Sequence, residues 1–375
     1  MRLLTQYGFI SLFDSENSYS FETFLKNAQV RTNARLTPLM QYMKKQNIKN
    51  DDVRIIYKHI VNRDDYLTRF FATSLYTDEI GIRSQEPMKS NFMNNNALVK
   101  YKNIIRNMHF KDILQKTKSG FGIPTYLDVL LELYTKEIID YKILTPSALK
   151  YIRDGRIGSV FSSFYFRASI MNPYLVYSLN TSVLQGTKIF TPTLGWSSYA
   201  YGFLECPRVD EYVGVDVIPD VCKKTDGFIK KYYSKTKHKI ICSPSEDLLE
   251  NKSFLKKYRE HFDVVFFSPP YYELELYPGK NQSTTVYNTY DEWLYGYWFK
   301  TIQLCYYLLE PKGTMCYILS SGGGNSQRNI LSDMNEITTN LFIKTKMLQM
   351  FNKNVHVTSG SHRDTNEKIM IFKKL

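Results

Sequence analysis

The stretch FFSPPYYELELY, residues 266–277, ends a strand-like run on a rigid corner. The preceding run HFDVVFF, residues 261–267, is apolar enough to predict a strand that is buried on both faces. Two consecutive prolines cannot donate hydrogen bonds to a sheet, so this strand has to end before Pro269. A serine, two prolines and two tyrosines therefore stand at the carboxyl end of a buried strand, which is where open parallel sheets bind their ligands.

The chain on both sides of this corner alternates strand-like and helix-like runs, which predicts an α/β layer. A helix is expected at 290–309, after a long loop, and a Pro-Lys-Gly turn at 311–313 is expected to precede the fifth strand. The last two apolar runs, 343–351 and 367–375, predict a terminal antiparallel hairpin. The five strand-bearing runs ahead of that hairpin are 187–204, 211–232, 238–249, 261–267 and 310–321.

The first 150 residues have a different pattern, with apolar residues spaced by three and four. This spacing predicts helices within 36–46, 51–76 and 124–144, with Asp51 and Pro124 near two of the starts. The Ser/Gly-containing passage at 153–164 is the best candidate for a boundary. We therefore expect a mainly helical, basic domain at 1–159 and an α/β domain at 160–375.

Composition narrows the classes of partner. The net charge of +13 favours acidic partners such as nucleic acid. No apolar run is long enough to cross a membrane and the N-terminus does not resemble a secretory signal, so we expect a soluble, intracellular protein without membrane contact. The five cysteines form no CxxC pair and the six histidines are scattered, so no metal site is expected.

The densest basic stretch is residues 100–120, where lysines alternate with apolar residues. The pattern favours a helix with one cationic face, and such a face contacts either nucleic-acid phosphates or only water. The candidate phosphate-binding residues are Lys100, Lys111, Lys116 and Lys118.

Asp216 ends the second predicted strand, about 20 residues after the first predicted turn. A carboxylate in this place can accept hydrogen bonds from both hydroxyls of a ribose, as in nucleoside-binding α/β units. The alternative is that Asp216 only caps the following helix.

Together these residues resemble the S-adenosylmethionine-dependent methyltransferases that modify the exocyclic amines of bases, especially adenine and cytosine of DNA. In that family the fourth strand ends in Asp, Asn or Ser, then Pro-Pro and an aromatic residue, and Ser268, Pro269, Pro270 and Tyr271 fit this motif. The segment 165–204 also looks like a subgroup in which a Phe-Arg helix precedes a Pro-x-x-Gly-Trp cofactor turn. The resemblance covers about 160–375 and implies a Rossmann-like methyltransferase sheet with a terminal antiparallel hairpin, behind the mainly helical N-terminal domain.

The resemblance also implies a role for each matched residue. Because the lone pair of a base amine is delocalised into the ring, the amine is a poor nucleophile. Ser268 and the carbonyl of Pro269 would accept its two N–H bonds and favour a pyramidal nitrogen, while Tyr271 would stack on the base. The residues expected to bind S-adenosylmethionine are Phe166, Arg167, Thr191, Pro192, Gly195, Trp196, Asp216, Ser245 and Glu246.

Two departures from the family pattern affect the expected cofactor grip. Thr191 stands where the family usually has an acidic residue, and Ser197 and Ser198 replace glycines after the Gly-Trp pair.

The leading expectation is methyl transfer to adenine or cytosine in DNA. The alternatives are an RNA adenine methyltransferase, including a cap-adjacent one, and a catalytically decayed subunit that binds nucleic acid or scaffolds a complex. The N-terminal domain is a possible site for a protein partner.

Overall fold

The computed structural model describes residues 3–15, 20–33, 35–115, 124–156, 160, 165, 168–272, 277, 280–320, 329–352 and 363–375. The chain divides into two compact units. The first contains Thr77–Ile105 and Ile170–Leu375, and the second contains Arg2–Tyr76 and Arg106–Ser169. The segment Thr77–Ile105 thus belongs with the sheet-bearing unit, although it lies far ahead of the boundary expected near residue 160.

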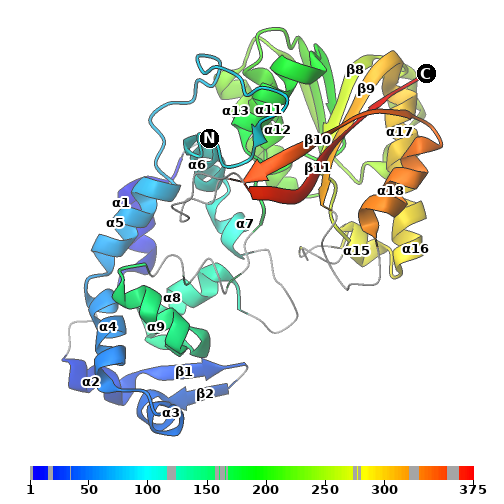
Figure 1. Cartoon of the computed structure of the whole chain (residues 1–375). Helices are drawn as coiled ribbons and strands as arrows, with labels where there is room; N and C mark the ends of the chain where they lie inside the picture. Colours follow the sequence, from blue (N-terminus) through cyan, green and yellow to red (C-terminus); the bar gives the residue numbers. More distant parts are fainter. Residues whose placement is uncertain are drawn as a thin grey trace. The chain divides into compact units, whose positions relative to one another are not determined.

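The first unit is built on an eight-stranded sheet with the order β3-β10-β11-β9-β8-β5-β6-β7 (Figure 1). Strands β9, β8, β5, β6 and β7 run parallel to one another, and β11 is antiparallel to both of its neighbours. The bounds of the strands are β3 Met93–Asn94, β5 Lys188–Thr191, β6 Glu211–Asp216, β7 Lys237–Cys242, β8 Phe262–Phe267, β9 Leu309–Ser320, β10 Ile343–Asn352 and β11 Arg363–Lys373.

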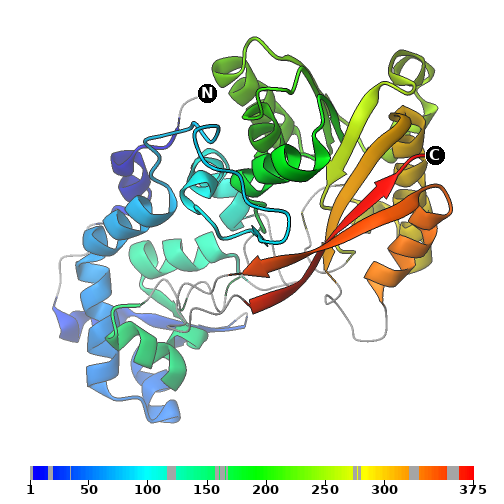
Figure 2. The same cartoon turned by 45° about the horizontal axis from the view of Figure 1, so that its top comes forward.

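Helices cover both faces of this sheet. In Figures 1 and 2, α11, α12 and α13 lie on one side of it, and α17 and α18 lie on the other. The residues expected in one helix at 290–309 form α16, a π-helical segment Leu294–Phe299 and α17. Trp293 and Trp298 are fully buried there, whereas Tyr295 is exposed. The helix bounds are α11 Pro173–Leu179, α12 Ser198–Leu204, α13 Pro219–Tyr232, α14 Lys252–Tyr258, α15 Ser283–Val286, α16 Tyr290–Trp293, α17 Lys300–Leu308 and α18 Ile330–Thr339.

The predicted fold class is confirmed, including the terminal antiparallel hairpin of β10 and β11. One local prediction is wrong. The turn expected at 311–313 lies inside β9, where the pairing with β8 shifts from Phe262↔Leu309 to Val264↔Thr314. The extra residues form a bulge in which Lys312 has a φ of +66°. A bulge accommodates a proline that a regular ladder would exclude, so the Pro-Lys-Gly signal marked an irregular strand instead of its start.

The second unit is mainly helical, as expected, but it also contains a three-stranded sheet with the order β2-β1-β4. Residues 36–38 lie in β2 and residues 138–140 in β4, so the helices predicted over these residues begin later or end earlier. Strands of three or four residues are too short to show an alternating pattern. The bounds in the second unit are α1 Gln6–Ile10, α2 Phe21–Asn27, β1 Gln29–Thr32, β2 Arg35–Pro38, α3 Leu39–Gln46, α4 Asn50–Val61, α5 Arg63–Ser74, α7 Phe110–Gln115, α8 Tyr126–Lys136, β4 Ile138–Asp140 and α9 Pro146–Arg153, while α6 Lys100–Met108 crosses the division.

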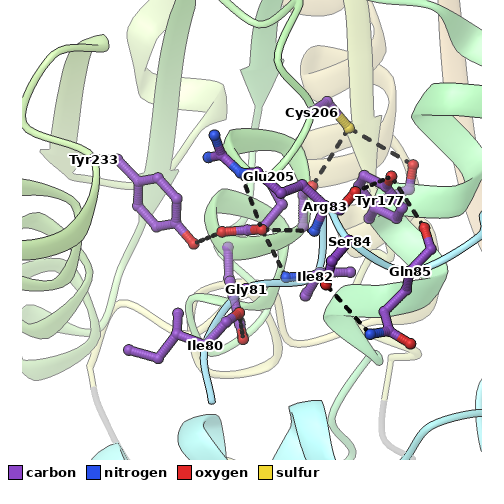
Figure 3. Close-up of polar contacts among 12 residues, drawn as sticks. Ile80, Gly81, Ile82, Arg83, Ser84, Gln85, Tyr177, Glu205, Cys206 and Tyr233 are labelled. Carbon is purple, nitrogen blue, oxygen red and sulfur yellow. Dashed lines mark hydrogen bonds and ion pairs between the residues drawn. The ribbon is translucent and has the colours of Figure 1, made fainter.

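Glu205, at the end of α12, ties the segment Thr77–Ile105 to the first unit (Figure 3). Its buried carboxylate accepts the backbone N–H groups of Ile82 at 2.7 Å and Arg83 at 2.9 Å, and the hydroxyl of Tyr233 at 2.6 Å. Three donors on one buried carboxylate satisfy a charge that would otherwise be costly in this position. The segment is therefore fixed by side-chain bonds to its backbone instead of by a long strand.

Candidate active site

The carboxyl ends of β8, β5, β6 and β7 lie side by side, because these four strands are parallel neighbours. Each end leads directly into a stretch that the sequence marked as functional. β5 leads into the turn that starts at Pro192, β6 ends on Asp216, β7 leads to Ser245, and β8 leads to Ser268. Pro192 and Ser268, 76 positions apart in the sequence, therefore lie at the same edge of the sheet, which is the edge where open parallel sheets bind ligands.

The turn between β5 and α12 has an unusual backbone. Gly195, Trp196 and Ser197 have φ angles of +51°, +58° and +71°. Left-handed conformations of this kind cost about 1–2 kcal/mol for each residue with a Cβ, and they persist where the surroundings enforce them. A hydrogen bond of 2.6 Å between the hydroxyls of Ser197 and Thr225 fixes the turn to α13. Such strain is concentrated at binding sites, which is consistent with the predicted cofactor turn.

Thr191, the first departure from the family pattern, is fully buried at the end of β5. Its hydroxyl hydrogen-bonds the hydroxyl of Tyr212 on β6 at 2.7 Å. A neutral pair thus stands where the family usually has a carboxylate, and this position supplies no negative charge.

The Asp216 carboxylate accepts hydrogen bonds from the turn before α12 and from the residue before α13. One carboxylate oxygen accepts the N–H of Leu194 at 3.1 Å and the other accepts the N–H of Ile218 at 3.0 Å. Burial raises the pKa of Asp216, and the backbone N–H groups partly offset this effect. A carboxylate has about four acceptor sites, so two such bonds leave capacity for ligand hydroxyls. The bond to Ile218 just before α13 also accords with the alternative that Asp216 caps that helix.

Ser245 and Glu246 lie beyond β7 and are both buried. The Glu246 carboxylate accepts a hydrogen bond from the Ser245 hydroxyl at 3.4 Å and another, also of 3.4 Å, from the Tyr287 hydroxyl. Burial is the main cause that raises the pKa of Glu246, and burial together with this carboxylate raises the pKa of Tyr287 to about 12. A buried carboxyl group with two long hydrogen bonds from hydroxyls therefore lies just beyond β7.

At the Ser-Pro-Pro corner, Ser268 is fixed by both its backbone and its side chain. Its N–H donates to the hydroxyl of Tyr199 at 3.0 Å, and its hydroxyl donates to the carbonyl of Ile318 on β9 at 3.0 Å. Because the Ser268 hydroxyl donates to Ile318, the Tyr271 hydroxyl at 3.4 Å can only donate to the Ser268 oxygen, which leaves one lone pair of that oxygen as an acceptor. This is the property that the proposed interaction with a base amine needs. Pro269 is buried, whereas Pro270 and Tyr271 are half-buried.

The two tyrosines after the prolines have different surroundings. The Tyr271 hydroxyl lies 3.4 Å from the Ser268 hydroxyl. Tyr272 has a φ of +46°, and its ring packs against Tyr290 and Trp293 with centroids 5.3 and 5.5 Å away. Tyr272 therefore fixes the corner onto α16.

Tyr199 is the site residue that the sequence analysis missed. It lies in the first turn of α12, with its ring beneath Gly195 and its hydroxyl against Ser268. Its only sequence signal is its place shortly after the Gly-Trp pair, four residues beyond Gly195. In a chain with 30 tyrosines that signal does not stand out.

Buried hydroxyls without a protein partner test whether a polar ligand fits here. Within the described residues, Ser198 Oγ and Tyr297 Oη are both inaccessible to solvent and have no hydrogen-bond partner. Buried polar atoms are normally satisfied, so two such atoms next to these strand ends fit a site that completes its hydrogen bonds with a ligand or ordered water.

Two of the four candidate phosphate-binding lysines lie within the described residues, Lys100 in the first unit and Lys111 in the second. Lys100 is exposed and pairs with Glu79 at 3.1 Å, and Lys111 is exposed on α7. Lys102, on the same helix as Lys100, is buried, so the basic stretch is less exposed than its pattern suggests. Lys116 and Lys118, together with the expected cofactor residues Phe166 and Arg167, lie outside the described residues.

In the described part of the chain, no group of three or more His, Cys, Asp or Glu side chains is placed to hold a metal ion. Within the same residues, no helix combines the length and the apolar character that spanning a bilayer requires.

Comparison with known proteins finds only distant similarity to solved structures. No protein-family model matches the chain, and no curated protein sequence matches it. Among solved structures, TrmN from Thermus thermophilus is 11% identical with a TM-score of 0.36, over 55% of this chain and 49% of that one. The N-methyltransferase NodS from Bradyrhizobium japonicum WM9, in complex with S-adenosyl-L-homocysteine, is 14% identical with a TM-score of 0.32, over 53% and 83%. A methyltransferase from Pyrococcus furiosus is 16% identical with a TM-score of 0.32, over 54% and 83%.

Scores this low carry no information about activity. The α/β fold of the first unit is described by its own strand order, in which five parallel strands are followed by the reversed strand β11 beside β9.

Proposed function

We propose that the chain transfers a methyl group from S-adenosylmethionine to the exocyclic amine of adenine or cytosine in DNA. The observation that carries the proposal is the state of Ser268. Its hydroxyl donates a hydrogen bond to the Ile318 carbonyl on β9. The Ser268 oxygen can therefore act as an acceptor, and it is held between β9 and the proline pair. An acceptor in this state can draw an amine N–H bond toward itself without donating a competing proton.

The proposed cofactor residues follow the strands next to β8, and this arrangement supports the proposal. Pro192, Gly195 and Trp196 would shape the turn, Asp216 would accept the ribose hydroxyls, and Ser245 with Glu246 would contact the adenine. S-adenosylmethionine supplies an electrophilic sulfonium methyl when bound. The protein's own contribution is to orient the amine: Ser268 and the Pro269 carbonyl hold its N–H bonds, and Tyr271 stacks on the base.

The positive charge and the Ser-Pro-Pro-Tyr corner support a nucleic-acid partner, and we propose DNA in preference to RNA. A net charge of +13 suits a polyanion. The same corner also serves RNA adenine methyltransferases, so RNA is the enzymatic alternative. Protein contacts through the N-terminal helical region are a further proposal.

One observation favours a non-catalytic role. The neutral pair of Thr191 and Tyr212 lacks the charge that the family uses near the cofactor's ammonium group. A chain that had lost cofactor binding while keeping its fold would act as a nucleic-acid-binding or scaffold subunit.

Transfer of a labelled methyl group tests these possibilities together. The substrates are single-stranded and double-stranded DNA and RNA in which one strand carries either adenine or cytosine but not both. The assay follows the label from S-adenosylmethionine into that strand. Incorporation into DNA that Ser268→Ala reduces supports the proposal. Incorporation into RNA alone supports the enzymatic alternative, and nucleic-acid binding without incorporation supports the scaffold role.

A further inference from the structure

Tyr199 contacts both halves of the proposed site with a single side chain. It is 2% exposed. Its ring lies so close to the cofactor turn that a Cβ on Gly195 would come within 2.3 Å of it. Its hydroxyl accepts the N–H of Ser268 at 3.0 Å and lies 3.5 Å from the Ser268 carbonyl, toward which it can donate.

The Tyr199 ring has little freedom to move. It packs edge-on against Phe266 of β8, with centroids 5.1 Å apart and planes at 89°. Burial raises the pKa of Tyr199, so the phenol keeps its proton at neutral pH and can accept and donate at the same time.

The corner needs such an external tie because of its own sequence. β8 ends at Phe267, and neither Pro269 nor Pro270 has an N–H with which to continue the sheet. Among the described contacts, Tyr199 is the hydrogen-bond partner of the Ser268 N–H. Ile318 then fixes the Ser268 side chain from the opposite element. Without the Tyr199 hydroxyl, Ser268 would lose the hydrogen bond to its backbone and keep the side-chain bond to Ile318.

We infer that Tyr199 is a positioning residue, which holds the amine acceptor Ser268 at a fixed place relative to the cofactor turn. The inference rests on the proposed function and adds a residue that the Ser-Pro-Pro-Tyr corner does not contain. Tyr199 touches neither the methyl group nor the base in this scheme. It acts on the reaction only through Ser268 and Gly195.

Tyr199→Phe tests this role, with Tyr201→Phe as its matched control. Both tyrosines lie on α12 and are buried, and each substitution removes one hydroxyl. The Tyr201 hydroxyl donates to the Ile80 carbonyl at 2.6 Å, so it serves the segment Thr77–Ile105 and not the corner. Any general effect of losing a buried hydroxyl on this helix is therefore common to both variants.

Two measurements are made on both variants and the parent. The first is amide hydrogen exchange at Ser268, which we expect to be at least about tenfold faster in Tyr199→Phe and within about twofold of the parent in Tyr201→Phe. The second is single-turnover methyl transfer, with separate dissociation constants for cofactor and nucleic acid. In Tyr199→Phe the rate should fall by about three- to tenfold, the range for one neutral hydrogen bond, while both dissociation constants stay within about twofold.

Each outcome decides something. Faster exchange with an unchanged rate makes Tyr199 merely structural and overturns the inference, as does an equal rate loss in Tyr201→Phe. An inactive parent contradicts the proposed function instead. In that case the exchange measurement still decides the placement, because unchanged exchange in Tyr199→Phe shows that the hydroxyl does not fix Ser268.

Discussion

Gly195→Ala perturbs the cofactor turn at its tightest point. A Cβ at this position would lie 2.3, 2.4 and 2.7 Å from three atoms of the Tyr199 ring. Separations under 3.0 Å do not occur between real atoms of this kind, so either the ring or the turn has to move. The ring is buried against Phe266, and the turn is tied to α13 through Ser197. Neither can move without breaking another contact.

The expected loss of stability has two parts. Alanine at a φ of +51° costs about 1–2 kcal/mol relative to glycine. Forcing an extra methyl group into a packed interior costs about 1–3 kcal/mol more. The free energy of unfolding of the first unit should therefore fall by about 2–5 kcal/mol.

Urea unfolding followed by tryptophan fluorescence measures this loss. The three tryptophans, Trp196, Trp293 and Trp298, all belong to the first unit, so the signal reports that unit alone. Gly81→Ala is the control in the same unit, because a Cβ at Gly81 meets nothing within 4 Å. Its expected effect is within about 1 kcal/mol of the parent. If the free energy of unfolding of Gly195→Ala also lies within about 1 kcal/mol of the parent's, the turn is not packed tightly against the Tyr199 ring.

Three further outcomes are expected. Ser268→Ala should lower the single-turnover rate with little change in nucleic-acid affinity, whereas Tyr271→Ala should also weaken that affinity by about 1–3 kcal/mol; equal effects on the rate alone would remove the stacking role. Glu246→Gln should raise the melting temperature at pH 7 but not at pH 4. Burial raises the folded-state pKa of Glu246 above 4.5, so its ionisation destabilises the folded state only as the pH rises past that value. An equal gain in melting temperature at both pH values would contradict this cause. Glu205→Ala removes the acceptor of two backbone N–H groups, which should destabilise the segment Thr77–Ile105 by about 3 kcal/mol or more and accelerate tryptic cleavage after Arg83, while an unchanged cleavage rate would show that the segment is held by other contacts.

The sheet was predictable because its strands are long, apolar and separated by turn residues. The run at 261–267 and the proline pair gave the end of β8 to the residue, and Asp216 lies at the end of β6 as predicted. The short strands β1, β2 and β4 were not predicted, because three or four residues are too few to show an alternating pattern. β5 is equally short, but the Pro/Gly turn that follows it marked its position. The bulge at Lys312 also escaped prediction, because Pro-Lys-Gly has the same appearance in a turn and in an irregular strand.

The site was predictable where a residue type is itself the signal. A Ser-Pro-Pro-Tyr corner and a strand-ending aspartate stand out in the sequence alone. Tyr199 does not, because its role depends on the packing of α12 over β8, and its ring is one of many aromatic rings in the core. The engagement of the Ser268 proton by Ile318 depends likewise on β9 lying next to β8, which only the fold reveals.

Calorimetric titration with S-adenosylmethionine tests whether the chain binds the cofactor that the proposed methyl transfer requires. We expect saturable binding to the parent at one site. In Asp216→Ala, with tryptophan fluorescence showing that the unit is folded, we expect binding weaker by about 1.5–3 kcal/mol, roughly 10- to 150-fold in the dissociation constant. Equal affinity in the two proteins would contradict the placement of the ribose, and no binding to the parent would contradict the proposed methyl transfer itself.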